Sequence, residues 1–245
     1  MRAWVLLFTS VLLGASFASL GNSQVIALNP GQSINFSQFT STNGSSVLVG
    51  DKLFGNFSFQ YGDTDTNLSN DLLPTAFTLT ALSNNVGFGI SFSGPMSVTG
   101  NVTDDVVFRF SITVTNSSQL ISDVHLDYNG TVLGSGFSSV TESVFTGGFG
   151  GNLIDQIDVF NVGGSNQLSA AANLPTPEQT VYVEKDVIFG GGAAGSLNAA
   201  SISIIDQTFS QIPEPTTILL SVAGLATLFF VKRRKRAAQT RTVKL

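Results

Sequence analysis

The chain lacks cysteine altogether, and it has only one histidine and one tryptophan among its 245 residues. Without cysteine the protein has no disulfide, no thiol nucleophile and no lipid-modified cysteine. A conventional Ser-His-Asp enzyme would have to use His125, the single histidine, and no G-x-S-x-G or H-E-x-x-H motif accompanies it. The composition therefore argues against an enzyme.

Positive charge is scarce between residues 19 and 211, where Lys52, Arg109 and Lys185 are the only basic residues against 15 acidic ones. A nucleic-acid binder needs clustered Lys and Arg side chains to contact phosphates. No nucleic-acid partner is therefore expected. An acidic surface rich in Ser, Thr and Asn suits an extracellular protein that stays soluble or meets divalent cations.

The N-terminus has the three parts of a secretory signal peptide. Arg2 supplies the positive charge, residues 4–13 form an apolar stretch, and Ser16-Phe17-Ala18 gives a small-x-small cleavage pattern. We expect signal peptidase to remove residues 1–18 and the rest of the chain to be exported.

The C-terminus combines a short motif, an apolar run and a basic cluster. Ile212-Pro213-Glu214-Pro215 precedes residues 216–231, which carry no charge. As a helix this run would be roughly 24 Å long, slightly short for a hydrocarbon core of ~30 Å, and basic stems beyond it can extend the span. The basic residues that hold the tail in the cytoplasm are Lys232, Arg233, Arg234, Lys235 and Arg236. An ordinary single-pass anchor is one interpretation.

This tail also resembles the PEP-CTERM sorting signal of Gram-negative and related bacteria. Pro213, Glu214 and Pro215 match the motif itself, with Ile212 where valine is most usual, and residues 237–245 extend further than the family's usual end. The resemblance implies processing by an exosortase-type enzyme in cells that produce exopolysaccharide and form biofilms. It also implies an inner-membrane precursor whose ectodomain is transferred or released to the cell surface or extracellular matrix.

Period-two alternation predicts an all-β fold for residues 19–211, which we expect to form a single antiparallel β-sandwich, jelly-roll-like in arrangement. In residues 106–115, for example, Val106, Phe108 and Phe110 point one way and Arg109 the other. Pro175 and Pro177 make residues 173–178 the best internal break, as either a long crossover or the edge of a C-terminal hairpin. The remaining predicted strands are 33–39, 53–61, 76–82, 86–93, 124–128, 138–145, 153–162, 180–189 and 200–209.

The region from Asp63 to Asn67 resembles the start of a calcium loop, D-x-D-x-N, in which Asp63, Asp65 and Asn67 would supply oxygen ligands. Leu68 and Pro74 stand where an EF-hand has Gly and Glu, so the EF-hand is excluded. A looser Ca²⁺ site and a plain turn remain, and no other cofactor is expected.

Two further groups of polar residues are candidate sites. Asp123, His125 and Asp127 alternate along one predicted strand and therefore share its face. The alternatives are a surface metal site, a histidine base flanked by carboxylates, and a plain solvent-facing strand. The adjacent carboxylates Asp104 and Asp105 are the kind of pair that a glycosidase uses, and an acidic surface also produces such pairs without function.

These observations favour a non-enzymatic protein of the cell envelope, structural or adhesive in the polysaccharide matrix. The alternative is a calcium-assisted carbohydrate-binding module. Such a module stacks aromatic rings on sugars. Because Trp4 lies in the signal peptide, the only polar-tipped rings available in residues 19–211 are Tyr61, Tyr128 and Tyr182. A secreted hydrolase is the least favoured hypothesis. The sequence leaves open the ligand, the oligomeric state, the cleavage sites, and whether the mature protein is released or attached.

Overall fold

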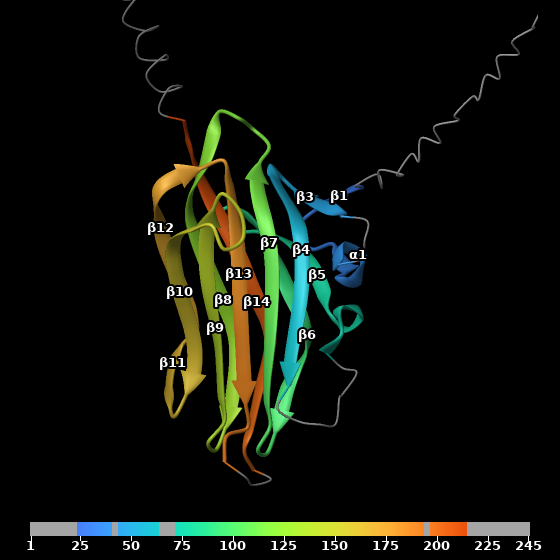
Figure 1. The fold of residues 1–245 in the computed structure, drawn as a ribbon, viewed down its shortest axis with the longest axis vertical. Coiled ribbons are helices and arrows are strands. Elements are labelled where there is room, and N and C mark those ends of the chain that lie inside the picture. The colour runs from blue at the N-terminus through green and yellow to red at the C-terminus, as the bar shows by residue number, and fades with distance from the viewer. Residues whose placement is uncertain (1–23, 41–43, 64–71, 194–196, 215–245) are drawn as a thin grey trace, which may run out of the picture.

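The computed structural model describes residues 24–40, 44–63, 72–193 and 197–214. These residues form two β-sheets that pack face to face, as Figure 1 shows. The all-β sandwich expected from the sequence is confirmed. Its neighbouring strands pair antiparallel, with the exception of the parallel pair β1 and β3.

The larger sheet, called sheet A, has eight strands. In spatial order they are β1 (Val25–Leu28), β3 (Ser46–Val49), β4 (Lys52–Asp63), β7 (Thr103–Val114), β13 (Thr180–Gly190), β9 (Phe137–Thr146), β10 (Asn152–Val162) and β11 (Ser165–Gln167).

The smaller sheet, called sheet B, has six strands. In spatial order they are β12 (Ser169–Glu178), β8 (Gln119–Leu133), β14 (Ala199–Pro213), β6 (Phe88–Thr99), β5 (Thr78–Ser83) and β2 (Ser33–Asn35). Two short helices, α1 (Ser37–Thr40) and η2 (Pro74–Ala76), complete the described part.

Phenylalanine rings fill the space between the sheets. Phe108 of sheet A and Phe92 of sheet B lie with ring centroids 4.7 Å apart, and the ring of Phe36 meets both edge-on at 5.6 Å. The predicted alternation of β7 is confirmed, since Val106, Phe108, Phe110, Ile112 and Val114 are all fully buried. Apolar burial of this kind supplies the main stabilisation of a sandwich.

The predicted strand over residues 33–39 is wrong beyond its first half. β2 ends at Asn35, whose side-chain oxygen accepts hydrogen bonds from the backbone N–H of Ser37 at 3.0 Å and from its hydroxyl at 2.6 Å. Such a cap turns the chain into a helix, and α1 follows directly. The turn delivers Phe36 and Phe39 into the core.

Residues 173–178, predicted as an internal break, belong to strand β12, and the ladder pairing is interrupted within them. β12 is the edge strand of sheet B, and its pairing with β8 skips from Asn173 to Glu178. Pro175 and Pro177 lie in the skipped part. An edge strand tolerates proline because one side of it needs no ladder hydrogen bonds.

The last strand runs into the proposed sorting motif. In β14, Ile212 pairs with Leu120 and Pro213 with Gln119, and the backbone N–H of Glu214 donates to the carbonyl of Ser118 at 2.8 Å. The signal peptide, Pro215, the apolar run 216–231 and the basic cluster 232–236 lie outside the described residues. Among the described residues, no helix is long and apolar enough to span a membrane.

Candidate functional site

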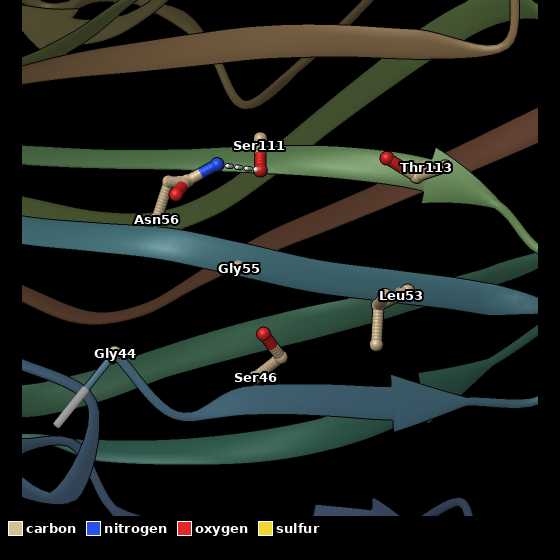
Figure 2. Close-up of a pocket in the computed structure, with 7 residues that line it drawn as sticks. All are labelled: Gly44, Ser46, Leu53, Gly55, Asn56, Ser111 and Thr113. Carbon is tan, nitrogen blue, oxygen red and sulfur yellow. Dashed lines mark hydrogen bonds between the residues drawn. The ribbon is translucent and has the colours of Figure 1, made fainter. Parts of the chain in front are cut away.

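A polar groove lies on the outer face of sheet A, across strands β3, β4 and β7 (Figure 2). Its volume is about 280 Å³. Hydroxyl, amide and backbone groups dominate its lining, with a single apolar side chain and no ionisable one. The lining residues are Gly44, Ser46, Leu53, Gly55, Asn56, Ser111 and Thr113.

The groove is shaped by a glycine and a β-bulge in its central strand. A methyl group added at Gly55 would lie 2.9 Å from the hydroxyl oxygen of Ser46, so this glycine keeps the floor open. The bulge falls between Gly55 and Ser58, and within it Asn56 has a φ of 53°. Asparagine tolerates this left-handed conformation better than most residues. The bulge directs the Asn56 amide to the hydroxyl of Ser111, to which it donates at 2.9 Å (Figure 2).

A row of outward side chains connects this groove with a cluster of aromatic rings. Strand register places Gly55 opposite Ser111, Ser111 opposite Tyr182, and Tyr182 opposite Phe145 on four successive strands. The ring of Phe149, from the β9–β10 turn, meets Tyr182 edge-on at 5.3 Å. Phe149 is 37% exposed. The outer face thus offers hydrogen-bonding groups and aromatic surface side by side.

The same face carries negative charge that little positive charge offsets. Lys52 and Lys185 are buried, and the third basic residue of the described part, Arg109, pairs with Glu184 at 2.5 Å. Asp186 lies on this face two rows from the groove. Burial and the neighbouring Asp105 carboxylate raise the pKa of Asp186 to about 6. A ligand of this face must therefore tolerate an anionic surrounding.

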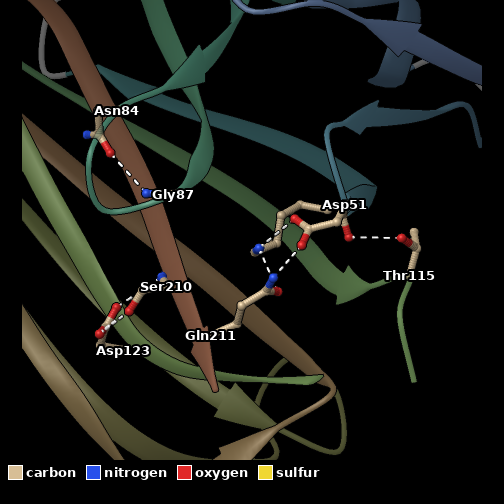
Figure 3. Close-up of polar contacts among 8 residues, drawn as sticks. Asp51, Asn84, Gly87, Thr115, Asp123, Ser210 and Gln211 are labelled. Atoms are coloured by element: carbon tan, nitrogen blue, oxygen red, sulfur yellow. Dashed lines mark hydrogen bonds and ion pairs between the residues drawn. The ribbon is translucent and has the colours of Figure 1, made fainter. Parts of the chain in front are cut away.

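The structure brings His125 and Asp123 together and places Asp127 apart from them. His125 Nε2 lies 3.1 Å from Asp123 Oδ1 on the outer face of sheet B. Asp123 also accepts hydrogen bonds from the backbone N–H and the hydroxyl of Ser210, which holds it on β14 (Figure 3). Asp127 instead lies opposite Asp206 in the strand register, and burial together with Asp127 raises the pKa of Asp206. The described residues contain no group of three metal-binding side chains.

The candidate calcium loop falls largely outside the described residues, which include Asp63 but neither Asp65 nor Asn67. Asp63 is the last residue of β4 and lies opposite Asp104 on β7. The carboxylate pair Asp104 and Asp105 is separated, because consecutive residues of a strand point to opposite faces. Asp104 is buried and Asp105 lies on the outer face, so the two cannot flank one sugar bond.

The three tyrosines have different surroundings. Tyr128 is buried between the sheets, where its hydroxyl lies 3.2 Å from that of Ser138 and burial raises its pKa. The hydroxyl of Tyr61 donates to Asp104 at 3.3 Å. Tyr182 alone of the three lies on the outer face beside the groove. The groove residues themselves were not predicted, because serine and glycine carry no local signal for a site.

Comparison with protein-family models and with curated protein sequences finds no match. Solved structures that resemble the chain include TmCBM61 in complex with β-1,4-galactotriose, with 10% identity, a TM-score of 0.31, and coverage of 64% of this chain and 88% of that one. A structure of carbohydrate-binding modules from the β-sandwich superfamily shows 8% identity and a TM-score of 0.30, over 64% and 56% of the two chains. The enzymatically active domain of bacteriophage CBA120 tailspike protein 4 shows 13% identity and a TM-score of 0.30; the match covers 63% of this chain and 19% of that one.

Proposed function

We propose that this protein is an exported, non-enzymatic glycan-binding component of the cell surface, and that it binds a neutral polysaccharide of the extracellular matrix on the outer face of sheet A. The observation that carries the proposal is the continuous row from the groove floor at Gly55 through Ser111 to the rings of Tyr182 and Phe145. Sugars present hydroxyl groups to polar partners and C–H faces to aromatic rings.

The ligand class follows from the charges around this row. The groove itself is lined without an ionisable side chain, while Glu184, Asp186 and Asp105 lie one, two and three rows from it on the same face. A polyanionic glycan would meet like charge there at the cost of unfavourable electrostatic energy. A neutral polysaccharide can instead exchange its hydrogen bonds with water for bonds to Ser46, Asn56 and Thr113.

Binding by the purified protein to a panel of neutral and acidic polysaccharides, measured by affinity electrophoresis, tests the proposal. Gly55→Val fills the groove with a side chain suited to a strand, and Tyr182→Ala removes the central ring; each should weaken binding at least tenfold. Ile204→Ala, at a residue 41% exposed on the outer face of sheet B, is the matched control and should bind as the wild type does. Equal binding by all variants, or preference for an acidic glycan, would refute the assignment.

The delivery of this domain to the surface belongs to the same proposal. Signal peptidase would remove residues 1–18, and an exosortase-type enzyme would act at Pro213, Glu214 and Pro215, with residues 216–231 as the membrane stop and 232–236 as the cytoplasmic charge. The mass of the protein recovered from separated membrane, periplasmic and extracellular fractions checks this. A surface product that starts near Ser19 and ends near Pro213 is expected. An intact C-terminus kept in the inner membrane would instead identify an ordinary anchor.

A further inference from the structure

Three polar side chains meet in the dry interior between the sheets. Lys185 of β13 and Glu142 of β9 lie opposite each other in sheet A, and Gln207 reaches them from β14 of sheet B. All three residues are 0% exposed. The Lys185 ammonium nitrogen, Nζ, donates hydrogen bonds to Glu142 Oε2 and to Gln207 Oε1. One amine thus contacts a carboxyl group and a primary amide at once.

The contacts leave part of this cluster unsatisfied. Gln207 Nε2 and Glu142 Oε1 are buried and have no hydrogen-bond partner. A buried donor or acceptor without a partner destabilises the folded state, because it gives up its hydrogen bonds to water and gains none. Loss of the Gln207 amide nitrogen would therefore lower the free energy of the folded protein.

The surroundings also favour an uncharged amine. Burial lowers the pKa of Lys185, and the neighbouring Glu142 opposes that shift. Transfer of one proton from Lys185 to Glu142 converts two buried charges into a neutral amine and a neutral acid, which a low-dielectric interior accommodates at less cost. A neutral lysine amine is a nucleophile, and the carbon next to its hydrogen-bond acceptor is the amide carbon of Gln207.

We propose that Lys185 and Gln207 form an intramolecular isopeptide bond that joins β13 of sheet A to β14 of sheet B. Lys185 Nζ attacks Gln207 Cδ, and a new N–C bond forms. Glu142, protonated by the earlier transfer, delivers that proton to Nε2 and takes the second proton that Nζ loses, so it ends as a neutral acid. The Cδ–Nε2 bond then breaks and ammonia leaves. One amide replaces another, so the step needs no oxidant or other co-reactant, and the unsatisfied nitrogen is the atom expelled.

The close contact between Lys185 Nζ and the Gln207 amide would accelerate formation of the bond. Groups held in contact react as though at effective concentrations far above any attainable in solution, and water is excluded from all three side chains. Escape of ammonia to bulk solvent then drives the exchange forward. The product links the last described strand covalently to the opposite sheet.

Peptide mapping of the protein purified from its producing cells tests the proposal. Cleavage after aromatic residues should yield a branched peptide in which residues 183–189 are joined to the segment that contains Gln207, lighter by about 17 Da than the two peptides together, the mass of one ammonia. Linear peptides of unmodified mass at both positions would overturn the proposal. A deficit of the same size found instead in a linear peptide with Asn129-Gly130, with no branched peptide present, would also overturn it, because a cyclising asparagine loses ammonia too.

Two variants test the assigned roles. Glu142→Gln keeps the shape but cannot shuttle the proton, so at least a tenfold smaller fraction of cross-linked peptide is expected. Lys185→Arg, which has no comparable nucleophile, should show none. The matched control is Gln211→Ala, at a second glutamine that accepts a hydrogen bond from a lysine, Lys52, at 2.9 Å; it should leave the branched peptide unchanged. Cross-linked peptide at wild-type levels in Glu142→Gln would exclude Glu142 as the shuttle and overturn the mechanism.

Discussion

Two lysine–glutamine–carboxylate clusters connect the sheets, and both use strand β14. The first is Lys185, Glu142 and Gln207. In the second, Lys52 Nζ donates to Asp51 Oδ1 at 2.8 Å and to Gln211 Oε1 at 2.9 Å. The composition is nearly the same, yet the second cluster lies near an end of the sandwich, where the Asp51 side chain is 28% exposed. The comparison isolates the effect of water on the same set of groups.

Hydrogen bonding differs between the clusters in one decisive respect. The amide nitrogen of Gln211 donates to Asp51, whose backbone carbonyl also accepts from the Thr115 hydroxyl at 3.1 Å (Figure 3). Burial raises the pKa of Asp51, but hydrogen bonds from Lys52 and Gln211 outweigh it and bring the pKa below its ordinary value. This carboxylate stays ionised and cannot pass on a proton. The wetter cluster is a satisfied ion-pair network, and only the dry cluster is set up to react.

Removal of each lysine should produce the largest contrast. Lys185→Ala leaves the buried Glu142 carboxyl group without its partner, whichever of the two carries the proton, so we expect a loss of about 3–5 kcal/mol in the free energy of unfolding. Lys52→Ala should cost about 1–2 kcal/mol, because water can reach Asp51. Urea unfolding of both variants measures the difference. Equal losses would mean that burial does not distinguish the clusters.

Replacement of the dry pair by apolar groups should recover part of that loss. In Lys185→Met with Glu142→Leu, both polar groups disappear together, and we expect about 2–3 kcal/mol more stability than in Lys185→Ala. The corresponding double variant Lys52→Met with Asp51→Leu serves as the control and should recover little, because the Asp51 site is partly hydrated. Recovery of the same size at both sites would contradict the interpretation.

The strand predicted over residues 180–189 is confirmed as β13, but the prediction did not assign a face to Lys185. Alternation with Val183 and Val187 puts it on the inner face, as it puts Phe108 on that of β7. Nothing local identifies Glu142 and Gln207 as its partners, because strand order brings them together across long stretches of chain. The groove was missed for the same reason. Ser46 and Ser111 line one groove only because the sheet order places their strands, β3 and β7, on either side of β4. Its bulge at Asn56 interrupts the alternation on which the prediction depends.

The stability that the protein loses at low pH through Asp51 should be smaller than the losses expected from the lysine substitutions. Its folded-state pKa lies below the ordinary 3.8, so its ionised form stabilises the protein above that pH, and this contribution is lost as pH falls through the folded-state pKa. Because the side chain is partly exposed, screening limits the effect to under about 1 kcal/mol. Asp51→Asn should therefore flatten the stability profile below about pH 4. An unchanged slope in urea unfolding at low pH would show that the cluster is not ionised as described.

The pH dependence of stability that Asp186 contributes should have the opposite sign to that of Asp51, and it should be the smallest of the expected effects. Burial and Asp105 raise the pKa of Asp186 from 3.8 to about 6. The folded protein therefore holds a proton that the unfolded chain has lost, and stability falls as pH rises from 3.8 through about 6. Asp186→Asn keeps a donor toward Asp105 and removes the charge. Glu184 and Arg109 on the same face remain.

We expect this variant to be more stable than the wild type at pH 7.5 by a few tenths of a kcal/mol, because the side chain is partly exposed and its shift is screened. At pH 4 the two proteins should unfold alike. Asp158→Asn, an exposed change on β10 of the same sheet, two strands from β13, is the control and should leave the profile unchanged. If Asp186→Asn is less stable than the wild type at pH 7.5, then Asp186 is held as a carboxylate. In that case the neighbour that matters is Arg109 rather than Asp105, and the outer face of sheet A is less anionic than a neutral ligand requires.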